Sequence, residues 1–123
     1  MPHFCKHRKN FLSNCKKIIN GVTTSFVYIG LPNSFTPMHV EDYHLSSANV
    51  LHQGSSKLWK CVSPNEANYF ESKLCEECQQ QWSEKHTLHL LRHKCLYICD
   101  QFFEKNKLLV TEVKQNSGEM IVG

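Results

Sequence analysis

Glycine and proline are scarce in this sequence, and none of its hydrophobic runs is long. The 123 residues include only 5 Gly and 4 Pro, which excludes a collagen-like or low-complexity chain. No apolar run approaches the roughly 20 residues that a membrane-spanning helix needs. The opening residues, MPHFCKHRKNF, also lack the apolar stretch of a secretory signal. We therefore expect a soluble, intracellular protein with no membrane partner.

Charge of neither sign dominates the chain. The net charge is +3 at pH 7, which is weak for a protein that binds nucleic acid or a membrane surface. A basic run at residues 6–9 is followed by Lys16 and Lys17, but no base-reading motif accompanies them. Direct nucleic-acid binding is not expected. With 41% hydrophobic residues, a chain of this length has the composition of one globular domain with a single core.

Cysteine and histidine are the conspicuous residue types. The chain has seven cysteines and eight histidines, and an odd cysteine count with a Cys-x-x-Cys pair favours metal binding or free thiols over a disulfide framework. A reducing compartment, nucleus or cytosol, fits this pattern. Buried thiols and solvated histidines on a helix face are the alternative to a zinc site. The candidate zinc ligands are Cys75, Cys78, His89 and His93.

The first half of the chain predicts mostly strands. Helical spacing of apolar residues predicts a short basic helix over 11–20, and period-two alternation predicts a buried strand over 25–30. A turn is expected at 31–34. The stretch 38–51 is strand-like, and residues 52–56 indicate a hairpin connection into a further strand that ends at Val62.

The second half predicts helices followed by strands. Ser63, Pro64 and Glu66 have the spacing of a capping box, so a helix should begin there. Its apolar stripe consists of Ala67, Phe70, Leu74 and Cys78. A second helix is expected around 88–91 and a third over 100–106. Strand-like segments are expected at 94–99, 107–115 and 118–123. Strands around a helical insertion suggest a mainly β sandwich or barrel.

His39-Val40-Glu41 is the strongest local indication of chemistry. In an extended strand, residues two apart point to the same side, so His39 and Glu41 are able to share one metal ion. They supply two ligands of the facial triad of two histidines and a carboxylate that holds non-haem Fe(II). An exposed His and Glu on a strand edge is the alternative interpretation.

A lysine and an asparagine follow on the next predicted strands. Alternation places Lys57 on one face with Trp59 and Cys61. A lysine that faces a barrel interior needs an anion, and the far carboxylate of a small dicarboxylic acid would meet that need. Asn49 and Ser47 share a face of the preceding strand and offer neutral hydrogen-bonding groups. Ordinary solvated polar residues are again the alternative.

These residues, in this order, resemble the JmjC domain of Fe(II)- and 2-oxoglutarate-dependent oxygenases, close to its lysine-demethylase branch. The resemblance is strongest over residues 21–62 and extends from about residue 11 to the end of the sequence. It includes Ser34-x-Thr36-x-x-His39-x-Glu41, Leu51-His52-x-Gly54, and Lys57 followed by Trp59. The segments LLRHKCLYI and GEMIV resemble later segments of the family. The ordered combination of these motifs is specific.

The resemblance implies a fold and a domain layout. The fold is expected to be mainly β with helical insertions, a partial double-stranded β-helix of the jelly-roll or cupin type. Residues 1–20 would form a basic N-terminal helix segment, and residues 21–123 an incomplete JmjC domain. A helical insertion rich in cysteine and histidine would occupy about 63–95 of that domain.

The resemblance also implies a site. His39 and Glu41 would bind Fe(II), and Lys57 would pair with the far carboxylate of 2-oxoglutarate, with Asn49 and Thr36 beside it. Tyr28 and Phe26 would line the channel for a methylated lysine of a histone tail or another protein, and the protein would be nuclear. Oxidation would hydroxylate an N-methyl group, which then leaves as formaldehyde.

Three departures from the family pattern are visible. Phe26 replaces a tyrosine that is common in the demethylases most similar to this chain, which puts the preferred methylation state in doubt. In the pattern of zinc ligands, His93 matches but Thr87 replaces the expected cysteine. The family's second iron-binding histidine follows the Gly-Glu-aliphatic segment, whereas here Gly118–Val122 is followed directly by Gly123.

The missing histidine leaves two explanations open. The chain is either part of a complete oxygenase, which we favour, or a short form without catalysis. Three functions therefore fit the sequence: a demethylase-type oxygenase, a catalytically inactive JmjC-like module that binds chromatin or protein, and a small zinc-binding adaptor.

Overall fold

The computed structural model describes residues 15–41 and 45–123. Two compact units are present, one that ends at Phe35 and one that spans Thr36–Gly123. The predicted domain boundary after residue 20 stays a prediction. In the described part of the chain, no helix is long and apolar enough to cross a membrane.

The first unit has little regular structure among its described residues. The predicted helix is wrong for residues 15–20, which are not helical, and residues 11–14 lie outside the described part. A turn at 21–23 is closed by the Asn20–Thr24 bridge instead. The predicted strand at 25–30 is also wrong, because this segment is irregular and its apolar side chains are exposed. The turn at 31–34 is confirmed by the hydrogen bond from Ser34 N to Leu31 O.

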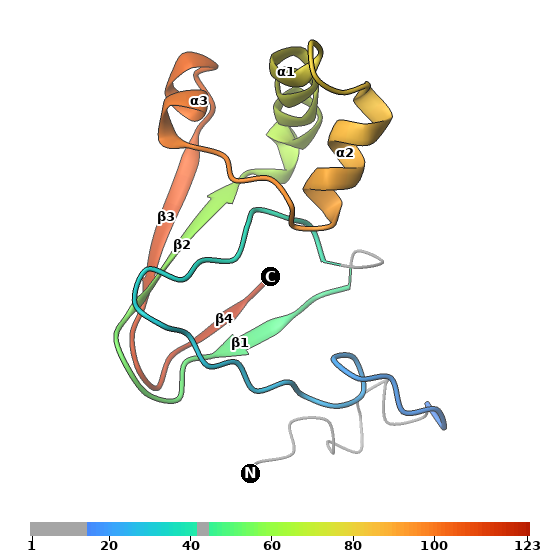
Figure 1. Ribbon diagram of the computed structural model, residues 1–123. Helices are drawn as coiled ribbons and strands as arrows, with labels where there is room; N and C mark the ends of the chain where they lie inside the picture. The colour runs from blue at the N-terminus through green and yellow to red at the C-terminus, as the bar shows by residue number, and fades with distance from the viewer. Residues whose placement is uncertain (1–14, 42–44) are drawn as a thin grey trace. The chain divides into compact units, whose positions relative to one another are not determined.

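The second unit is built on a bent two-stranded ribbon (Figure 1). β2 (Lys57–Val62) pairs antiparallel with β3 (Val110–Gln115), and β1 (Ala48–Val50) pairs antiparallel with β4 (Met120–Val122). Between the two ladders, Leu51 N donates to Glu119 O and Gly118 N donates to Leu51 O. The prediction of a hairpin at 52–56 is wrong because β1 and β2 pair with β4 and β3 and not with each other. The described strands close no barrel.

The positions of the strands correct three further expectations. Of the predicted strand at 38–51, only β1 is formed; residues 38–41 are irregular, and 42–44 lie outside the described part. Residues 95–99 form no strand. The extended segments predicted near the C-terminal end are confirmed as β3 and β4. Gly118, with φ of +88°, occupies the turn between them, where a side chain would be strained.

Three helices lie at one end of the β2–β3 ladder (Figure 1). A 3₁₀ turn, η4 (Pro64–Glu66), leads into α1 (Ala67–Cys78), and α2 (Glu84–Arg92) and α3 (Asp100–Lys105) follow. Ser63 caps the turn by accepting from Asn65 N, so the predicted helix start is confirmed. The reciprocal half of the capping box is not formed, because Glu66 Oε2 is buried without a hydrogen-bond partner.

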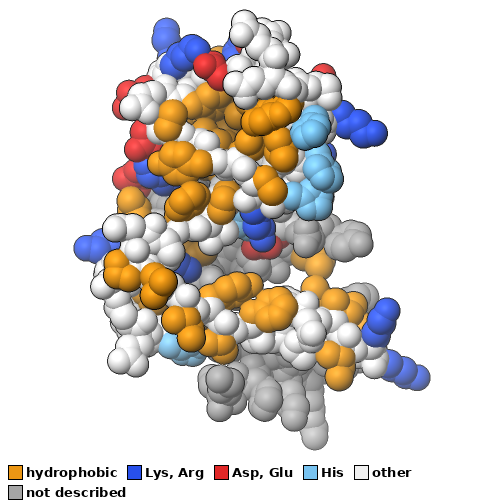
Figure 2. All heavy atoms as spheres, viewed as in Figure 1, with side chains coloured by type: hydrophobic (Ala, Val, Ile, Leu, Met, Phe, Trp, Pro, Cys, Tyr) orange, Lys and Arg blue, Asp and Glu red, His pale blue; other side chains and the backbone are white. Residues whose placement is uncertain are grey.

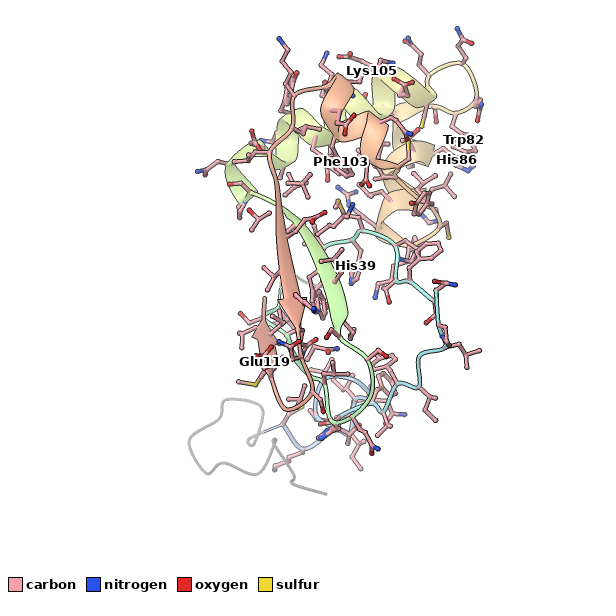
Figure 3. The ribbon with its side chains drawn as sticks, turned by 90° about the vertical axis from the view of Figure 1, so that its left-hand side faces the viewer. His39, Trp82, His86, Phe103, Lys105 and Glu119 are labelled. Atoms are coloured by element: carbon pink, nitrogen blue, oxygen red, sulfur yellow. The ribbon has the colours of Figure 1, made fainter. Side chains whose placement is uncertain are left out.

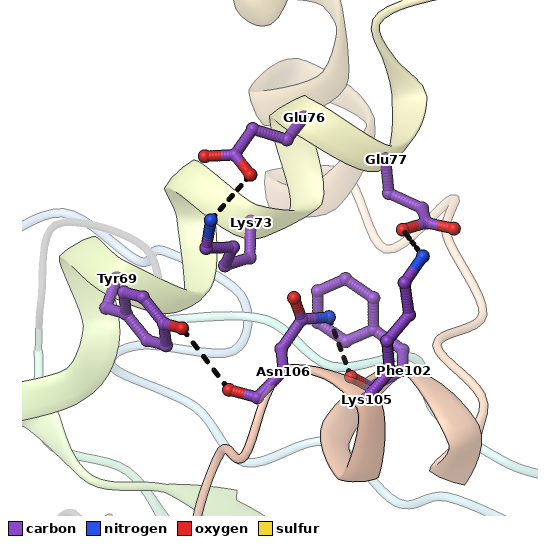
Figure 4. A network of polar contacts seen from close by, with 7 residues as sticks. All are labelled: Tyr69, Lys73, Glu76, Glu77, Phe102, Lys105 and Asn106. Carbon is purple, nitrogen blue, oxygen red and sulfur yellow. Dashed lines mark hydrogen bonds and ion pairs between the residues drawn. The ribbon is translucent and has the colours of Figure 1, made fainter.

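The core lies between these helices and the near end of the ribbon. The Phe70 ring stacks on Phe103 at 6.1 Å and meets Phe102 edge-on at 5.9 Å. At the surface, Lys105 pairs with Glu77, and Tyr69 donates to the backbone oxygen of Asn106 (Figure 4). These contacts join α1 to α3. The buried apolar residues are Phe70, Leu74, Leu91, Phe102, Phe103 and Leu108.

Candidate functional site

His39 and Glu41 lie in an irregular segment that is anchored by the two residues before the histidine. Met38 packs against the helical core, and the carbonyl oxygen of Pro37 lies 2.8 Å from His39 Nδ1. This contact assigns the proton to Nδ1 and leaves the Nε2 lone pair free to bind a metal. The His39 side chain is 18% exposed and that of Glu41 45%. The segment therefore presents a fixed imidazole beside a more exposed carboxylate.

The two side chains point to the same side, as the sequence predicted. His39 Nε2 and Glu41 Oε1 are 3.7 Å apart. Two ligands that bind one ion from the same side at about 2.0–2.2 Å are roughly 3.0–3.4 Å apart, so this pair would bind one ion after closing by a few tenths of an ångström. The pair provides two ligands. In the described ranges, no cluster of three or more His, Cys, Asp or Glu side chains is suited to a metal.

Lys57 and Asn49 are brought together from different strands. Lys57 Nζ donates to Asn49 Oδ1 at 3.1 Å and lies 4.5 Å from the centre of the Trp59 ring. Burial lowers the pKa of Lys57, because desolvation disfavours its charged form. The prediction that Lys57 and Trp59 share a face is confirmed. The resulting arrangement is an ammonium group held between an amide oxygen and an aromatic ring.

Gln115 is the residue of this region that sequence reasoning missed. It has no solvent exposure, and its side chain accepts from Trp59 Nε1 while donating to the backbone oxygens of Asn49 and Glu119. Glu119 lies in the turn at the end of the ribbon away from the helices (Figure 3). A glutamine in an alternating strand carries no local indication of such a role, since its partners come from distant segments.

The remaining predicted site residues are exposed. Thr36 lies at the start of the second unit. Phe26 and Tyr28 belong to the first unit, with 55% and 78% of their surface exposed, and their rings meet edge-on at 6.1 Å. The two aromatic rings form a local pair.

The structure brings together only part of the predicted zinc set. The rings of His89 and His93 are 4.1 Å apart, and histidine side chains gather along the edge formed by α2 (Figure 2). Cys75 and Cys78 lie on α1, and burial raises the pKa of both thiols, which disfavours the thiolate that zinc binds. All six described cysteines are free. A four-ligand zinc site stays a prediction.

Comparison with known proteins places the chain in a family. The model of the family described as JmjC domain, hydroxylase matches residues 26–122. Rat lysine-specific demethylase 4D is 31% identical over 108 residues, which cover 88% of this chain and 21% of the relative. Human probable lysine-specific demethylase 4F is 32% identical over 108 residues, which cover 88% of this chain and 17% of the relative.

A plant relative matches over a similar part of the chain. Lysine-specific demethylase REF6 of Arabidopsis thaliana is 31% identical over 114 residues, which cover 92% of this chain and 8% of that protein. The chain thus spans about a fifth or less of the length of these relatives. It belongs to the JmjC domain family, whose fold is the cupin type of jelly roll.

Proposed function

We propose that this chain supplies the Fe(II) and 2-oxoglutarate site of a nuclear JmjC oxygenase that demethylates lysine. The observation that carries the proposal is the pairing of His39 Nε2 with Glu41 Oε1 at 3.7 Å, with His39 Nδ1 fixed by Pro37. Family membership supports the reaction class. The names of the relatives, lysine-specific demethylases, support the substrate class.

His39 and Glu41 would hold the metal from one side. When bound, Fe(II) with 2-oxoglutarate would supply the oxidising power to hydroxylate an N-methyl group. The two residues contribute orientation: the Pro37 carbonyl fixes the imidazole, and the carboxylate brings the negative charge that a divalent cation requires. The proposal requires a further ligand, which the described residues do not place beside this pair.

Lys57 would receive the far carboxylate of 2-oxoglutarate. Its ammonium has three N–H donors, one of which goes to Asn49 Oδ1. A charge-assisted hydrogen bond from this ammonium to a carboxylate is shorter and stronger than one between neutral groups. Asn49 would hold the lysine in place, and the Thr36 hydroxyl would add a neutral contact to the oxoacid.

Phe26 and Tyr28 would receive the methylated lysine. Aromatic faces attract a methylammonium cation, and this pair presents two rings in edge-on contact. The partner would be a histone tail or another protein with a methylated lysine. Phe26 offers no hydroxyl, so Tyr28 would supply the polar contact that positions the ammonium.

The proposal is tested by anaerobic titration of the chain with Fe(II) and 2-oxoglutarate, following the metal-to-ligand charge-transfer absorption. We expect a saturable absorption band in the wild-type chain. His39→Ala should abolish this band, and Lys57→Ala should lower the affinity for 2-oxoglutarate at least about tenfold. His52→Ala is the matched control, because His52 is exposed in the loop after β1, and it should leave the band unchanged.

Absence of any band in the wild-type chain would contradict the proposal. Binding of a methyl-lysine peptide without a band would then favour the inactive module. If the wild-type chain shows no band but binds zinc, and His89→Ala loses the zinc, the zinc-binding adaptor would be favoured.

A further inference from the structure

Gln115 is the most constrained polar side chain in the described part of the second unit. It is fully buried, and its amide makes three hydrogen bonds of 2.9–3.0 Å: with Trp59 Nε1, Asn49 O and Glu119 O. An amide has one acceptor and two donors in its plane, and here each type of group is used. A buried side chain satisfied in this way has one orientation.

The groups that Gln115 holds are those that surround Lys57. Gln115 Oε1 accepts a hydrogen bond from the indole N–H of Trp59, and the centre of the Trp59 ring lies 4.5 Å from Lys57 Nζ. Gln115 Nε2 donates to the backbone oxygen of Asn49, and the side-chain oxygen of Asn49 accepts a hydrogen bond from Lys57 Nζ. Gln115 also lies directly opposite Lys57 in the β2–β3 register. One buried amide is thus connected to both partners of the ammonium group.

The same amide fixes the bend of the ribbon. Gln115 is the last residue of β3, and its bond to Glu119 O spans the turn into β4. Asn49 lies on β1, which pairs with β4. Without the amide, an indole N–H and two carbonyl oxygens would lose a buried partner, and each such loss is costly. The relative placement of Asn49 and Lys57, which lie on different ladders, therefore depends on Gln115.

We infer that Gln115 is the positioning residue of the carboxylate-binding site, holding Trp59 and Asn49 so that Lys57 Nζ points at the far carboxylate of a dicarboxylic acid. The inference rests on the proposed function for the identity of that acid. Gln115 itself acts through its neighbours and makes no contact with the ligand. The placement of Trp59 is a consequence that does not depend on any ligand.

The experiment uses the full chain with Trp82→Phe, which leaves Trp59 as the sole tryptophan. Gln115→Met keeps the side-chain volume and removes all three hydrogen bonds. We expect a red-shifted Trp59 emission with stronger acrylamide quenching, and at least about fivefold weaker 2-oxoglutarate binding in the anaerobic Fe(II) titration. Ser56→Ala is the matched control, since it removes the Ser56–Asn116 hydrogen bond at the same bend and should change neither quantity.

Each outcome decides the inference. Wild-type 2-oxoglutarate affinity in Gln115→Met would overturn it, whether or not the Trp59 emission shifts, and equal losses of affinity in Ser56→Ala would overturn it as well. If the unsubstituted chain binds no 2-oxoglutarate, the proposed function fails, and the Trp59 emission alone decides whether Gln115 holds this site. If Gln115→Met does not fold, Trp59→Phe replaces it: this variant keeps a ring under Lys57 and removes the bond to Gln115. Weaker 2-oxoglutarate binding then supports the inference, and unchanged binding overturns it.

Discussion

Two lysines of β2 experience opposite electrostatic surroundings. Lys57 lies over the Trp59 ring, donates to Asn49 and pairs with no acidic side chain of the described residues, and burial lowers its pKa. Lys60 pairs with Asp100 on α3 and Glu112 on β3. The hydrogen bond to Asp100 is the largest effect and raises the pKa of Lys60; desolvation partly opposes it, and Glu112 adds a smaller upward effect. The same strand thus carries one lysine suited to an external anion and one already neutralised.

We predict that Lys57 titrates below 10.5 and Lys60 above it. The unfavourable contribution of Lys57 to stability is present below its lowered pKa and diminishes as the pH rises toward 10.5. The favourable contribution of Lys60 is complete below 10.5 and is lost as the pH rises through its folded pKa. NMR titration of the lysine side chains, assigned with Lys57→Arg and Lys60→Arg, measures both. A pKa of Lys57 above that of Lys60 would contradict the surroundings that the structure gives these two lysines.

Among the elements, α1 supplies the centre of the core. Phe70 is 5% exposed and contacts the rings of Phe102 and Phe103. We predict that Phe70→Ala lowers the free energy of unfolding by about 3–5 kcal/mol, measured by urea denaturation. Ser72→Ala, on the exposed face of the same helix, should change it by less than about 0.5 kcal/mol. If Phe70→Ala is fully unfolded, Phe70→Leu replaces it, with a smaller expected loss of the free energy of unfolding. Equal losses for the substitutions at Phe70 and Ser72 would contradict the assignment of Phe70 to the core.

The helices could be predicted from the sequence because their determinants are local. The Ser63 cap and the spacing of Phe70 and Leu74 lie within one segment, and α1 forms where they indicate. His39 and Glu41 lie close together, as their spacing suggested, although the strand from which this was argued is not formed at 38–41. Their role as metal ligands stays a prediction. The contact between Asn49 and Lys57 depends on how the four strands pair, so the sequence carries no local indication of it. The assignment of both residues to one ligand rests on the family resemblance and stays a prediction.

The strands were predicted less well because a strand depends on a distant partner. Residues 25–30 and 95–99 are as apolar as β2, yet they pair with no strand in the described part of the chain. β3 and β4 gain their register from β2 and β1. The role of Gln115 was missed for the same reason. Its three hydrogen-bond partners come from three different segments, and the alternation within β3 gives no indication of them.

At the scale of the whole molecule, order is distributed unevenly between the two units. The second unit has a core and two ladders, whereas the described residues of the first unit contain hydrogen-bonded turns at 19–24 and 31–34 and pair as strands only at the single Asn20–Thr24 bridge. Ile29 is 91% exposed and Tyr28 78%. A jelly-roll strand needs a neighbour for its backbone groups, and residues 25–30 make no strand pairing among the described residues. The segment to which we assign the methyl-lysine contact is thus one that no strand pairing supports among the described residues.

Hydrogen exchange tests this difference directly. We predict that the backbone amides of residues 25–30 exchange at nearly the rate of an unstructured peptide, whereas those paired between β2 and β3 exchange at least about a hundredfold more slowly. The Ser34 amide, which donates to Leu31 O, is the internal reference within the first unit and should be intermediate. Slow exchange across 25–30 would mean that this segment has found a strand partner, and the predicted strand would then be correct. Addition of a methyl-lysine peptide that slows exchange at Phe26 and Tyr28 alone would place its binding on the aromatic pair.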